Sequence, residues 1–373
     1  MGAGLYIHIP FCHSKCSYCD FYSMPLRQEL ENVYIDALLA EWRMRRDEIR
    51  QPITTIYLGG GTPSILSDAN LSRLVSSLDL DIDSLSEFTI EVNPEDITPQ
   101  RASLLGSLGI NRVSMGVQSL DDKLLQTIGR RHDSHTAIRA YETLRSCGFG
   151  NISLDLMYGL PTQTLMQWEQ TLHMMLDKLH PEHLSAYILS YEPGTRMTAM
   201  RDAGKLKPID DETTIGMYHL LCQMSRDYGY GHYEISNFAL PGREARHNAA
   251  YWDMSPYIGL GPGAHSFDGI STRRSNPWNL RKYISSLSSG FTVCEEEKED
   301  AVTLHNDIVM VSLRTRRGLD LVKWHEHADR WLDAARPYLA SGEMILTDDR
   351  RLVISEYAWP MADTYISELL MVD

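Results

Sequence analysis

The chain has 373 residues, a formal net charge of −15 and 43% hydrophobic residues, which indicates a folded protein of one large or two modest domains. Its acidity opposes general binding to nucleic acid, because such binding depends on neutralising phosphates. No apolar run approaches the roughly 18 residues of a membrane span, and the N-terminus lacks a secretory signal pattern. We therefore expect a protein of the reducing cytoplasm with no transmembrane segment, which leaves peripheral membrane contact open.

Short β-rich runs alternate with helical patterns through the first half of the chain. The predicted strands cover 5–9, 53–58, 88–92, 112–117, 152–157 and 183–189, and the predicted helices cover 27–50, 68–78, 98–108, 121–128, 134–146 and 165–179. Strands that alternate with helices pair in parallel, and right-handed crossovers curl such a sheet toward a barrel. The predicted fold class is therefore α/β, with an incomplete (βα)6 TIM-like barrel.

The pattern loosens in the second half of the chain. A helix is predicted over 211–228, loops and short strands over 229–269, helices over 277–288, 296–314, 319–339 and 357–370, and a hairpin at 344–346 and 352–354. Residues 295–300 are expected to be a solvated acidic run. We therefore expect a barrel domain over residues 1–277 and a small helical, winged-helix-like domain over residues 278–373.

Three cysteines, Cys12, Cys16 and Cys19, follow the first predicted strand within eight residues, whereas the other three are scattered singly. Thiolates select zinc, Cu(I) or iron–sulfur clusters. A four-iron cluster normally takes four cysteines, so three would leave one iron open to a substrate or cofactor. With His13 as a fourth ligand, the same loop would form a small structural zinc site instead. A disulfide framework is disfavoured, because the crowded loop leaves an odd thiol.

Polar residues or glycines also follow the next four predicted strands. They are Gly59–Pro63 after the second strand, Glu91 and Asn93 at the third, Gln118 at the fourth and Asp155 at the fifth. In parallel α/β folds the chemistry gathers at the carboxyl ends of the strands. We therefore expect all these residues to converge on one mouth. The glycines would either let a ligand approach the backbone or form a tight structural turn.

Two carboxylates in this set, Glu91 and Asp155, end apolar runs, where an unpaired charge would be costly. They would either accept hydrogen bonds from an amino group or hydroxyls of a ligand, or pair with Arg112 or Arg130. Arg130 would alternatively pair with a ligand carboxylate. Their convergence with the cysteines favours ligand binding.

A polar and aromatic string, His247–Trp252, stands out in the loose segment. A histidine beside aromatic rings suits axial ligation of haem iron, with flat rings to stack on the macrocycle. The alternative is a hydrogen-bonded packing histidine, which is our expectation for His8, His232 and His265.

A basic cluster in the C-terminal region is formed by Arg314, Arg316 and Arg317. A winged helix would present such a cluster to DNA, but the acidic run nearby and the overall charge oppose this. We therefore expect no binding to nucleic acid.

Together, the C-x3-C-x2-C loop and the Tyr-x-His-Ile-Pro-Phe-Cys run that begins at Tyr6 resemble the radical S-adenosylmethionine (SAM) superfamily. Within it they resemble the branch that contains oxygen-independent coproporphyrinogen III dehydrogenase (HemN) and the haem chaperone HemW. The resemblance covers nearly the whole chain. It implies that Cys12, Cys16 and Cys19 hold a [4Fe–4S] cluster whose open iron binds SAM, and that electron transfer cleaves SAM to a 5′-deoxyadenosyl radical. The residues it places around SAM are Tyr6, Gly60, Gly61, Thr62, Glu91, Gln118, Arg130 and Asp155.

Two features favour the chaperone type over the dehydrogenase. The dehydrogenase carries a further cysteine where this chain has Phe21, and it has a longer N-terminal arm. The haem-binding signature of the chaperone, H-N-x-x-Y-W, is intact at His247, Asn248, Tyr251 and Trp252. The resemblance therefore implies haem binding and delivery to respiratory proteins. The alternative is an enzyme of porphyrin metabolism that decarboxylates coproporphyrinogen III to protoporphyrinogen IX.

Overall fold

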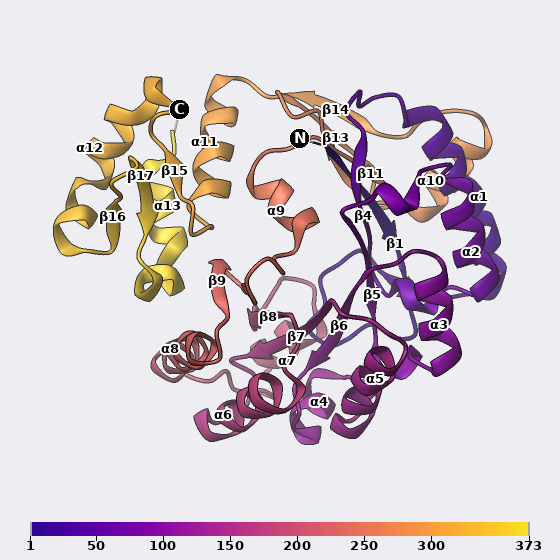
Figure 1. Cartoon of the computed structure of the whole chain (residues 1–373), viewed down its shortest axis with the longest axis horizontal. Helices are drawn as coiled ribbons and strands as arrows, with labels where there is room; N and C mark the ends of the chain where they lie inside the picture. Colours follow the sequence, from indigo (N-terminus) through magenta and orange to yellow (C-terminus); the bar gives the residue numbers. More distant parts are fainter. Residues whose placement is uncertain (1, 372–373) are drawn as a thin grey trace.

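The computed structural model describes residues 2–371 and shows a strongly curved sheet with helices on its outer side (Figure 1). Its twelve strands lie in the order β14-β13-β12-β11-β1-β4-β5-β6-β7-β8-β10-β9. The central six, all parallel and in chain order, are β1 (Ala3–Ile9), β4 (Ile53–Gly60), β5 (Glu87–Val92), β6 (Arg112–Gln118), β7 (Ile152–Tyr158) and β8 (His183–Ile188). The predicted α/β class with six parallel strands is confirmed.

Later strands extend both edges of the parallel unit. On β1 lie β11 (Tyr257–Leu260), which is parallel to it, and then the antiparallel β12 (His265–Phe267), β13 (Thr272–Ser275) and β14 (Glu295–Lys298). On β8 lie the antiparallel β10 (Asn237–Ala239) and β9 (Gly231–Glu234). Since β14 and β9 stand at opposite ends of the strand order, the sheet stays open. This is an incomplete barrel, as the sequence predicts.

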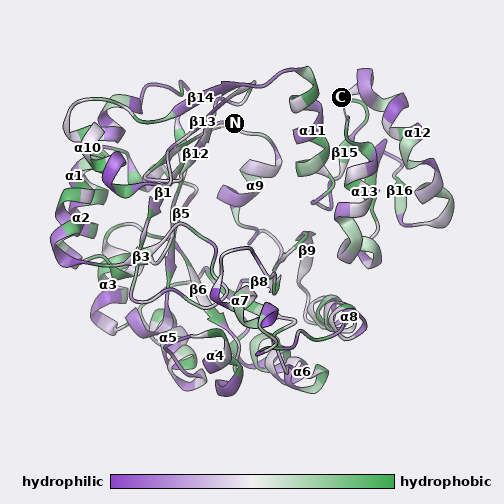
Figure 2. Cartoon of the chain, turned by 180° about the vertical axis from the view of Figure 1, so that it is seen from behind, coloured by the Kyte–Doolittle hydropathy of each residue, from purple (hydrophilic) through white to green (hydrophobic). Residues whose placement is uncertain are grey.

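The crossover helices cover the convex face of the sheet (Figure 1). They are α1 (Gln28–Arg45), α2 (Asp68–Ser77), α3 (Pro99–Ser107), α4 (Asp122–Ile128), α5 (Ser134–Ser146) and α6 (Leu165–His173), which runs on into a π-helical turn, Met174–Leu179. Local caps start several of them; for example, Thr98 Oγ1 accepts from the Arg101 N–H at 3.1 Å. Their hydrophobic and hydrophilic residues alternate in Figure 2, as expected for helices with one buried face.

Four further helices follow β8: α7 (Arg196–Asp202), α8 (Asp211–Asp227), α9 (Arg246–Trp252) and α10 (Leu280–Ser288). The expectation of only loops and short strands over 229–269 is wrong for α9. Its cap comes from the carboxylate of Glu87, which accepts from the backbone N–H groups of Arg246 at 2.7 Å and His247 at 3.1 Å. A cap supplied from a residue 160 positions away leaves no local signal in the sequence.

The C-terminal region contains α11 (Ala301–Ser312), α12 (His325–Ser341), a 3₁₀ segment at Glu356–Met361 and α13 (Ala362–Leu369). A three-stranded sheet accompanies them, in the order β15 (Leu319–Asp320), β17 (Arg351–Ile354), β16 (Met344–Leu346). The predicted helices with a hairpin are confirmed. Figure 1 shows this region beside α9, on the open side of the curved sheet.

Two predicted helices in this part begin too early. The acidic run is exposed at Glu295–Lys298, as expected, but these residues form β14, which pairs with β13, and α11 starts only after Asp300. Opposite charges explain the pairing, because Arg274 Nε donates to Glu296 Oε2 across the two strands at 3.0 Å. Likewise, the first residues of the other predicted helix form β15, which pairs with β17 before α12 begins. Because α10 contacts α1 and β14 joins the large sheet, the boundary at 277/278 stays a prediction.

Candidate functional site

The three clustered cysteines lie on a loop that the backbone closes at both ends. After β1, the short strands β2 (Phe11–Cys12) and β3 (Met24–Pro25) pair in parallel. Within the loop, the Ser17 N–H donates to the Ile128 carbonyl at 3.1 Å, and the Ser17 carbonyl accepts from the Met197 N–H at 2.8 Å. All six cysteines of the chain are free of disulfide bonds. The loop is therefore held in place by hydrogen bonds, and its three thiols are available as ligands.

These thiols line a cavity of about 360 Å³ at the carboxyl ends of the parallel strands, which we call the cysteine pocket. Most of the residues predicted around SAM line it too. The predicted residues in its wall are Cys12, Cys16, Cys19, Gly60, Gly61, Thr62, Glu91, Gln118, Arg130, Asp155 and Asn248. The expected convergence of five strand ends on one mouth is confirmed as geometry, and the binding role of each residue stays a prediction.

Tyr6 is the exception in the predicted SAM set, because it lines a neighbouring cavity, the aromatic pocket described below, and not the cysteine pocket. Its hydroxyl lies 3.0 Å from His8 Nδ1, and its ring lies beside Tyr57, with 6.1 Å between the ring centroids. His8 Nε2 in turn lies 2.9 Å from the Tyr22 carbonyl, which confirms His8 as a packing residue. The strand that carries Tyr6 is buried on both faces, so alternation could not show which face would meet the cysteine pocket.

The glycines at the end of β4 serve the packing of the chain as well as the pocket wall. A Cβ on Gly61 would come within 2.4 Å of the Phe11 carbonyl oxygen, on the segment that leads into the cysteine loop. Gly60 has a φ of +112°, and a Cβ there would meet the His8 ring at 2.7 Å. The structural turn that the sequence left open as an alternative is therefore present, and its close packing places the backbone against the pocket.

The carboxylate of Glu91 is satisfied by neutral donors rather than by an arginine. The Tyr57 hydroxyl donates to Oε1 at 2.8 Å, and the Gly60 N–H donates to Oε2 at 3.0 Å. Burial raises the pKa of Glu91 to about 7 despite these hydrogen bonds. Glu91 is therefore poised to ionise near neutral pH, when a positive group approaches.

The carboxylate of Asp155 likewise faces hydroxyl groups. Ser114 Oγ donates at 3.0 Å and Ser153 Oγ at 3.1 Å. Burial raises the pKa of Asp155, and the positive charge of Arg112 opposes that rise. The predicted arginine pairing is thus replaced by hydroxyl partners, with Arg112 acting at longer range.

The guanidinium of Arg130 connects the cysteine loop to the strand ends. It donates to the Gly116 carbonyl at 2.6 Å, to Asn93 Oδ1 at 2.8 Å and to Cys16 Sγ at 3.6 Å. Arg130 therefore ties the cysteine loop to β6 and to Asn93, a role that the sequence did not suggest.

Gln118, at the end of β6, has a left-handed backbone with a φ of +67°. The register with β7 shifts between Gly116 and Gln118, which marks a bulge in the strand. Non-glycine residues with left-handed backbone angles are strained, and they concentrate at functional sites. The bulge directs Gln118 to the wall of the cysteine pocket.

The residues of the H-N-x-x-Y-W string diverge because they lie on one helix, α9. His247 is 1% exposed and its ring nitrogens already have partners: Nδ1 lies 2.8 Å from Thr55 Oγ1 and Nε2 lies 2.8 Å from the Tyr251 hydroxyl. Burial lowers the pKa of His247 to about 3. Asn248 faces the cysteine pocket, whereas Trp252 lines a cavity on the C-terminal side.

Tyr251 borders a second cavity of about 320 Å³, which we call the aromatic pocket. Its walls include Tyr6, Tyr22, Tyr257 and Trp278. His265, expected to be a packing residue, is instead exposed and lines this pocket. Phe21, which is 62% exposed, lines both pockets, so the two cavities are neighbours.

Several pocket residues were not found from the sequence. Tyr57, Ser114, Ser185 and Tyr187 all line the cysteine pocket. Tyr57, Ser114 and Ser185 lie inside stretches of strand buried on both faces, where no polar–apolar alternation marks the inward side, and Tyr187 lies at the exposed end of β8. By contrast, two arginines of the predicted basic cluster form ion pairs: Arg314 with Asp363 at 2.7 Å and Arg317 with Asp253 at 2.9 Å.

Comparison with known proteins matches residues 6–175 to the radical SAM superfamily. The chain is 36% identical to the heme chaperone HemW of Bacillus subtilis over 89% of its own length and 88% of that protein. It is 34% identical to the mitochondrial radical S-adenosyl methionine domain-containing protein 1 of Mus musculus, over 87% and 76% of the two chains. Among solved structures, coproporphyrinogen III oxidase (HemN) from Escherichia coli superposes with a TM-score of 0.84 at 23% identity, covering 99% of this chain and 90% of that one. None of the helices within residues 2–371 is long and apolar enough to cross a membrane.

Proposed function

This chain belongs to the HemW family of the radical SAM superfamily, and we propose that it is a haem chaperone that delivers haem to respiratory proteins. The observation that carries the proposal is the 36% identity to a heme chaperone over 89% of the chain. The intact H-N-x-x-Y-W string and Phe21 in place of a further cysteine support the same assignment.

The cysteine pocket fits a [4Fe–4S] cluster with SAM, which a radical SAM domain implies. Three soft thiol donors share one loop, and Glu91, Asp155, Arg112 and Arg130 line the same cavity. Two buried guanidinium nitrogens in that wall, Arg112 Nε and Arg130 Nε, have no acceptor among residues 2–371, and a bound anionic group would supply one. When bound, the cluster supplies the electron that SAM cleavage requires.

The residues of the pocket would then divide the work of binding SAM. Glu91 would accept from the amino group, whose positive charge favours the ionised carboxylate. Asp155, held by two serines, would accept from hydroxyl groups. Gly60 and Gly61 would let the ligand approach the backbone closely, because neither carries a Cβ, while their N–H groups donate to Glu91 and to the Ile9 carbonyl.

Haem would bind at the aromatic pocket, where flat rings suit a macrocycle. His265 would offer an exposed imidazole there. His247 would act by positioning, because its Nε2 lies 2.8 Å from the hydroxyl of Tyr251 at the pocket wall. The neighbouring cysteine pocket, which shares Phe21 with this site, would make haem binding sensitive to the state of the cluster.

Anaerobic reconstitution of the cluster, followed by haem titration and a coproporphyrinogen III turnover assay, tests the function. We expect one haem per chain, transfer of that haem to haem-depleted respiratory membranes, and no decarboxylation. Robust turnover without haem binding would overturn the proposal and establish the dehydrogenase alternative.

Variants of the two histidines separate a ligand from a positioning residue. We expect His265→Ala to shift the Soret band of ferric haem, because the axial imidazole is lost. His247→Ala should weaken haem binding at least tenfold without that shift and leave the cluster spectrum intact. His173→Ala, at an exposed position on α6, is the control. Unchanged haem affinity in His247→Ala would remove His247 from the proposal.

A further inference from the structure

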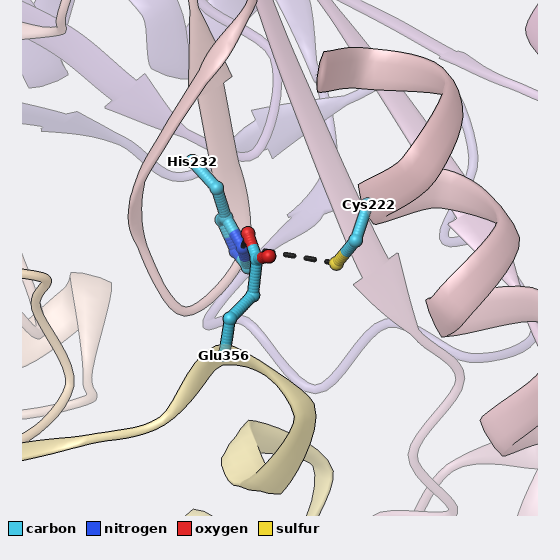
Figure 3. A group of neighbouring side chains, drawn as sticks. All are labelled: Cys222, His232 and Glu356. Atoms are coloured by element: carbon cyan, nitrogen blue, oxygen red, sulfur yellow. Dashed lines mark hydrogen bonds and ion pairs between the residues drawn. The ribbon is translucent and has the colours of Figure 1, made fainter. Parts of the chain in front are cut away.

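A third cavity, of about 440 Å³, lies where the barrel meets the C-terminal region, and we call it the junction pocket. Cys222 on α8 and His232 on β9 reach it from the barrel side, and Glu356 reaches it from the 3₁₀ segment before α13 (Figure 3). The positions are far apart in the sequence, so the tertiary structure alone brings them together.

The three side chains direct their donor atoms toward one point. Cys222 Sγ lies 3.8 Å from His232 Nδ1, which lies 3.2 Å from Glu356 Oε1, and all three atoms lie within 4.8 Å of one another. In tetrahedral zinc coordination, the sulfur–nitrogen separation is about 3.6 Å and the nitrogen–oxygen separation is about 3.4 Å. The side chains therefore already stand close to the spacing that a zinc ion requires.

The His232 ring is fixed in the orientation that a ligand needs. It stacks on Phe238 with 4.0 Å between centroids and meets Trp359 edge-on at 4.2 Å. Its Nε2 faces the Ile235 carbonyl at 3.5 Å. Metal-bound histidines commonly donate their other N–H to a backbone carbonyl, which leaves the first nitrogen unprotonated. In the metal-free chain Nδ1 hydrogen-bonds to Glu356 Oε1; zinc binding would require the tautomer with the proton on Nε2, in which Nδ1 acts as the lone-pair donor.

An ion pair without a metal is the simpler explanation of part of this cluster. Glu356 Oε2 pairs with Arg226, but the side chains of Glu356 and Arg226 are 38% and 66% exposed, so the pair contributes little to stability. It does not account for a buried thiol and a buried imidazole nitrogen that face the same carboxylate. In metal sites, a ligating carboxylate commonly keeps such a partner on its second oxygen.

We propose that Cys222, His232 and Glu356 bind a zinc ion whose fourth position opens into the junction pocket. A mixed sulfur, nitrogen and oxygen set suits this borderline ion, whereas Mg²⁺ and Ca²⁺ take oxygen ligands. Arg226 and Arg316 line the pocket, so water or a small anion completes the coordination. The ion joins the barrel to the C-terminal region and does not depend on the proposed haem delivery.

The test uses the full chain with its cluster reconstituted, equilibrated with Zn²⁺ and freed of loosely held metal. We expect one zinc per chain, with an X-ray absorption spectrum of one sulfur and three nitrogen or oxygen neighbours. Cys222→Ser and Glu356→Gln should each lower zinc affinity at least tenfold. Cys294→Ser, at a partly buried thiol elsewhere, should leave it unchanged.

Three results would overturn the site. One is less than stoichiometric zinc in the wild-type chain. Another is unchanged zinc affinity in Glu356→Gln; this variant should fold, because the Glu356 side chain is 38% exposed and the substitution keeps its size. The third is an all-sulfur coordination shell, which would place the zinc at the cysteine loop.

Discussion

The cysteine pocket and the junction pocket both set thiols beside carboxylates and arginines, but they are built differently. In the first, three thiols come from one eight-residue loop and the remaining groups from successive strand ends. In the second, the donors come from positions 222, 232 and 356. A ligand set that is local in the chain can be recognised from spacing, whereas a dispersed set becomes visible only after folding.

The carboxylates of the two pockets also respond oppositely to their surroundings. Burial raises the pKa of Glu91 in the cysteine pocket. At the junction, the hydrogen bond with His232 lowers the pKa of the partly exposed Glu356. Burial therefore dominates the pKa of Glu91, and the hydrogen bond with His232 dominates the pKa of Glu356. Substitutions of these two carboxylates should therefore change stability with opposite dependence on pH.

Loss of one thiol from the cysteine loop should have the largest effect, and it should affect iron and sulfide binding at the cysteine pocket alone. Cys12→Ala should abolish stable iron and sulfide binding after anaerobic reconstitution, because two thiols cannot hold a four-iron cluster. Cys222→Ser should retain both, since that thiol belongs to the other pocket, and Cys147→Ser is the matched control. Iron and sulfide analysis per chain decides the outcome. Loss of the cluster in Cys222→Ser would show that the pockets are not independent.

Substitution of a glycine should cost stability in the wall of the cysteine pocket but not on an exposed helix. Gly61→Ala should lower the free energy of unfolding by about 2–3 kcal/mol, because its Cβ would stand 2.4 Å from the Phe11 carbonyl oxygen. Gly106→Ala, within α3 and free of neighbours within 4 Å, should instead stabilise the chain by about 0.5–1 kcal/mol. Chemical denaturation measures both, and equal stability of the two variants would contradict the packing argument.

Glu91→Gln should stabilise the cofactor-free chain in alkaline solution. The folded pKa of about 7 lies above the ordinary value, so the native fold favours the neutral carboxyl and loses that stability as pH rises through 7. The variant should gain on the order of 1 kcal/mol at pH 8 and nothing at pH 4. Thermal unfolding at both pH values provides the measurement. A difference that does not change with pH would sink the interpretation.

Glu356→Gln should show the opposite and smaller dependence in metal-free protein. Since the folded pKa of Glu356 is lowered, its stabilising effect is present above the unfolded pKa and is lost as pH falls through the folded value. The variant should lose under about 1 kcal/mol at pH 7, less at high salt, and nothing in strong acid. Denaturation in a chelating buffer tests this, with Asp333→Asn, in an exposed ion pair on α12, as the control. A larger loss at low pH than at pH 7 would contradict the assignment.

Much of the barrel and of its mouth could be predicted from the amino-acid sequence. Alternating strand and helix patterns predicted the six parallel strands, because the hydrophobic period is set locally. In parallel α/β folds the functional residues gather at the carboxyl ends of the strands. This rule correctly predicted that Glu91, Gln118 and Asp155 lie in one cavity with the cysteines. It did not distinguish Tyr6, which lines the neighbouring pocket, since both faces of β1 are buried.

The features that depend on partners distant in the chain could not be predicted before the chain was seen folded. Glu87 caps α9, so the H-N-x-x-Y-W string becomes a helix that buries His247 and distributes its neighbours among different cavities. In the same way, β13 turns an acidic run into a strand. The junction pocket joins Cys222, His232 and Glu356. In each case the deciding hydrogen bond or contact links residues far apart along the chain, and such contacts leave no periodicity or spacing to read.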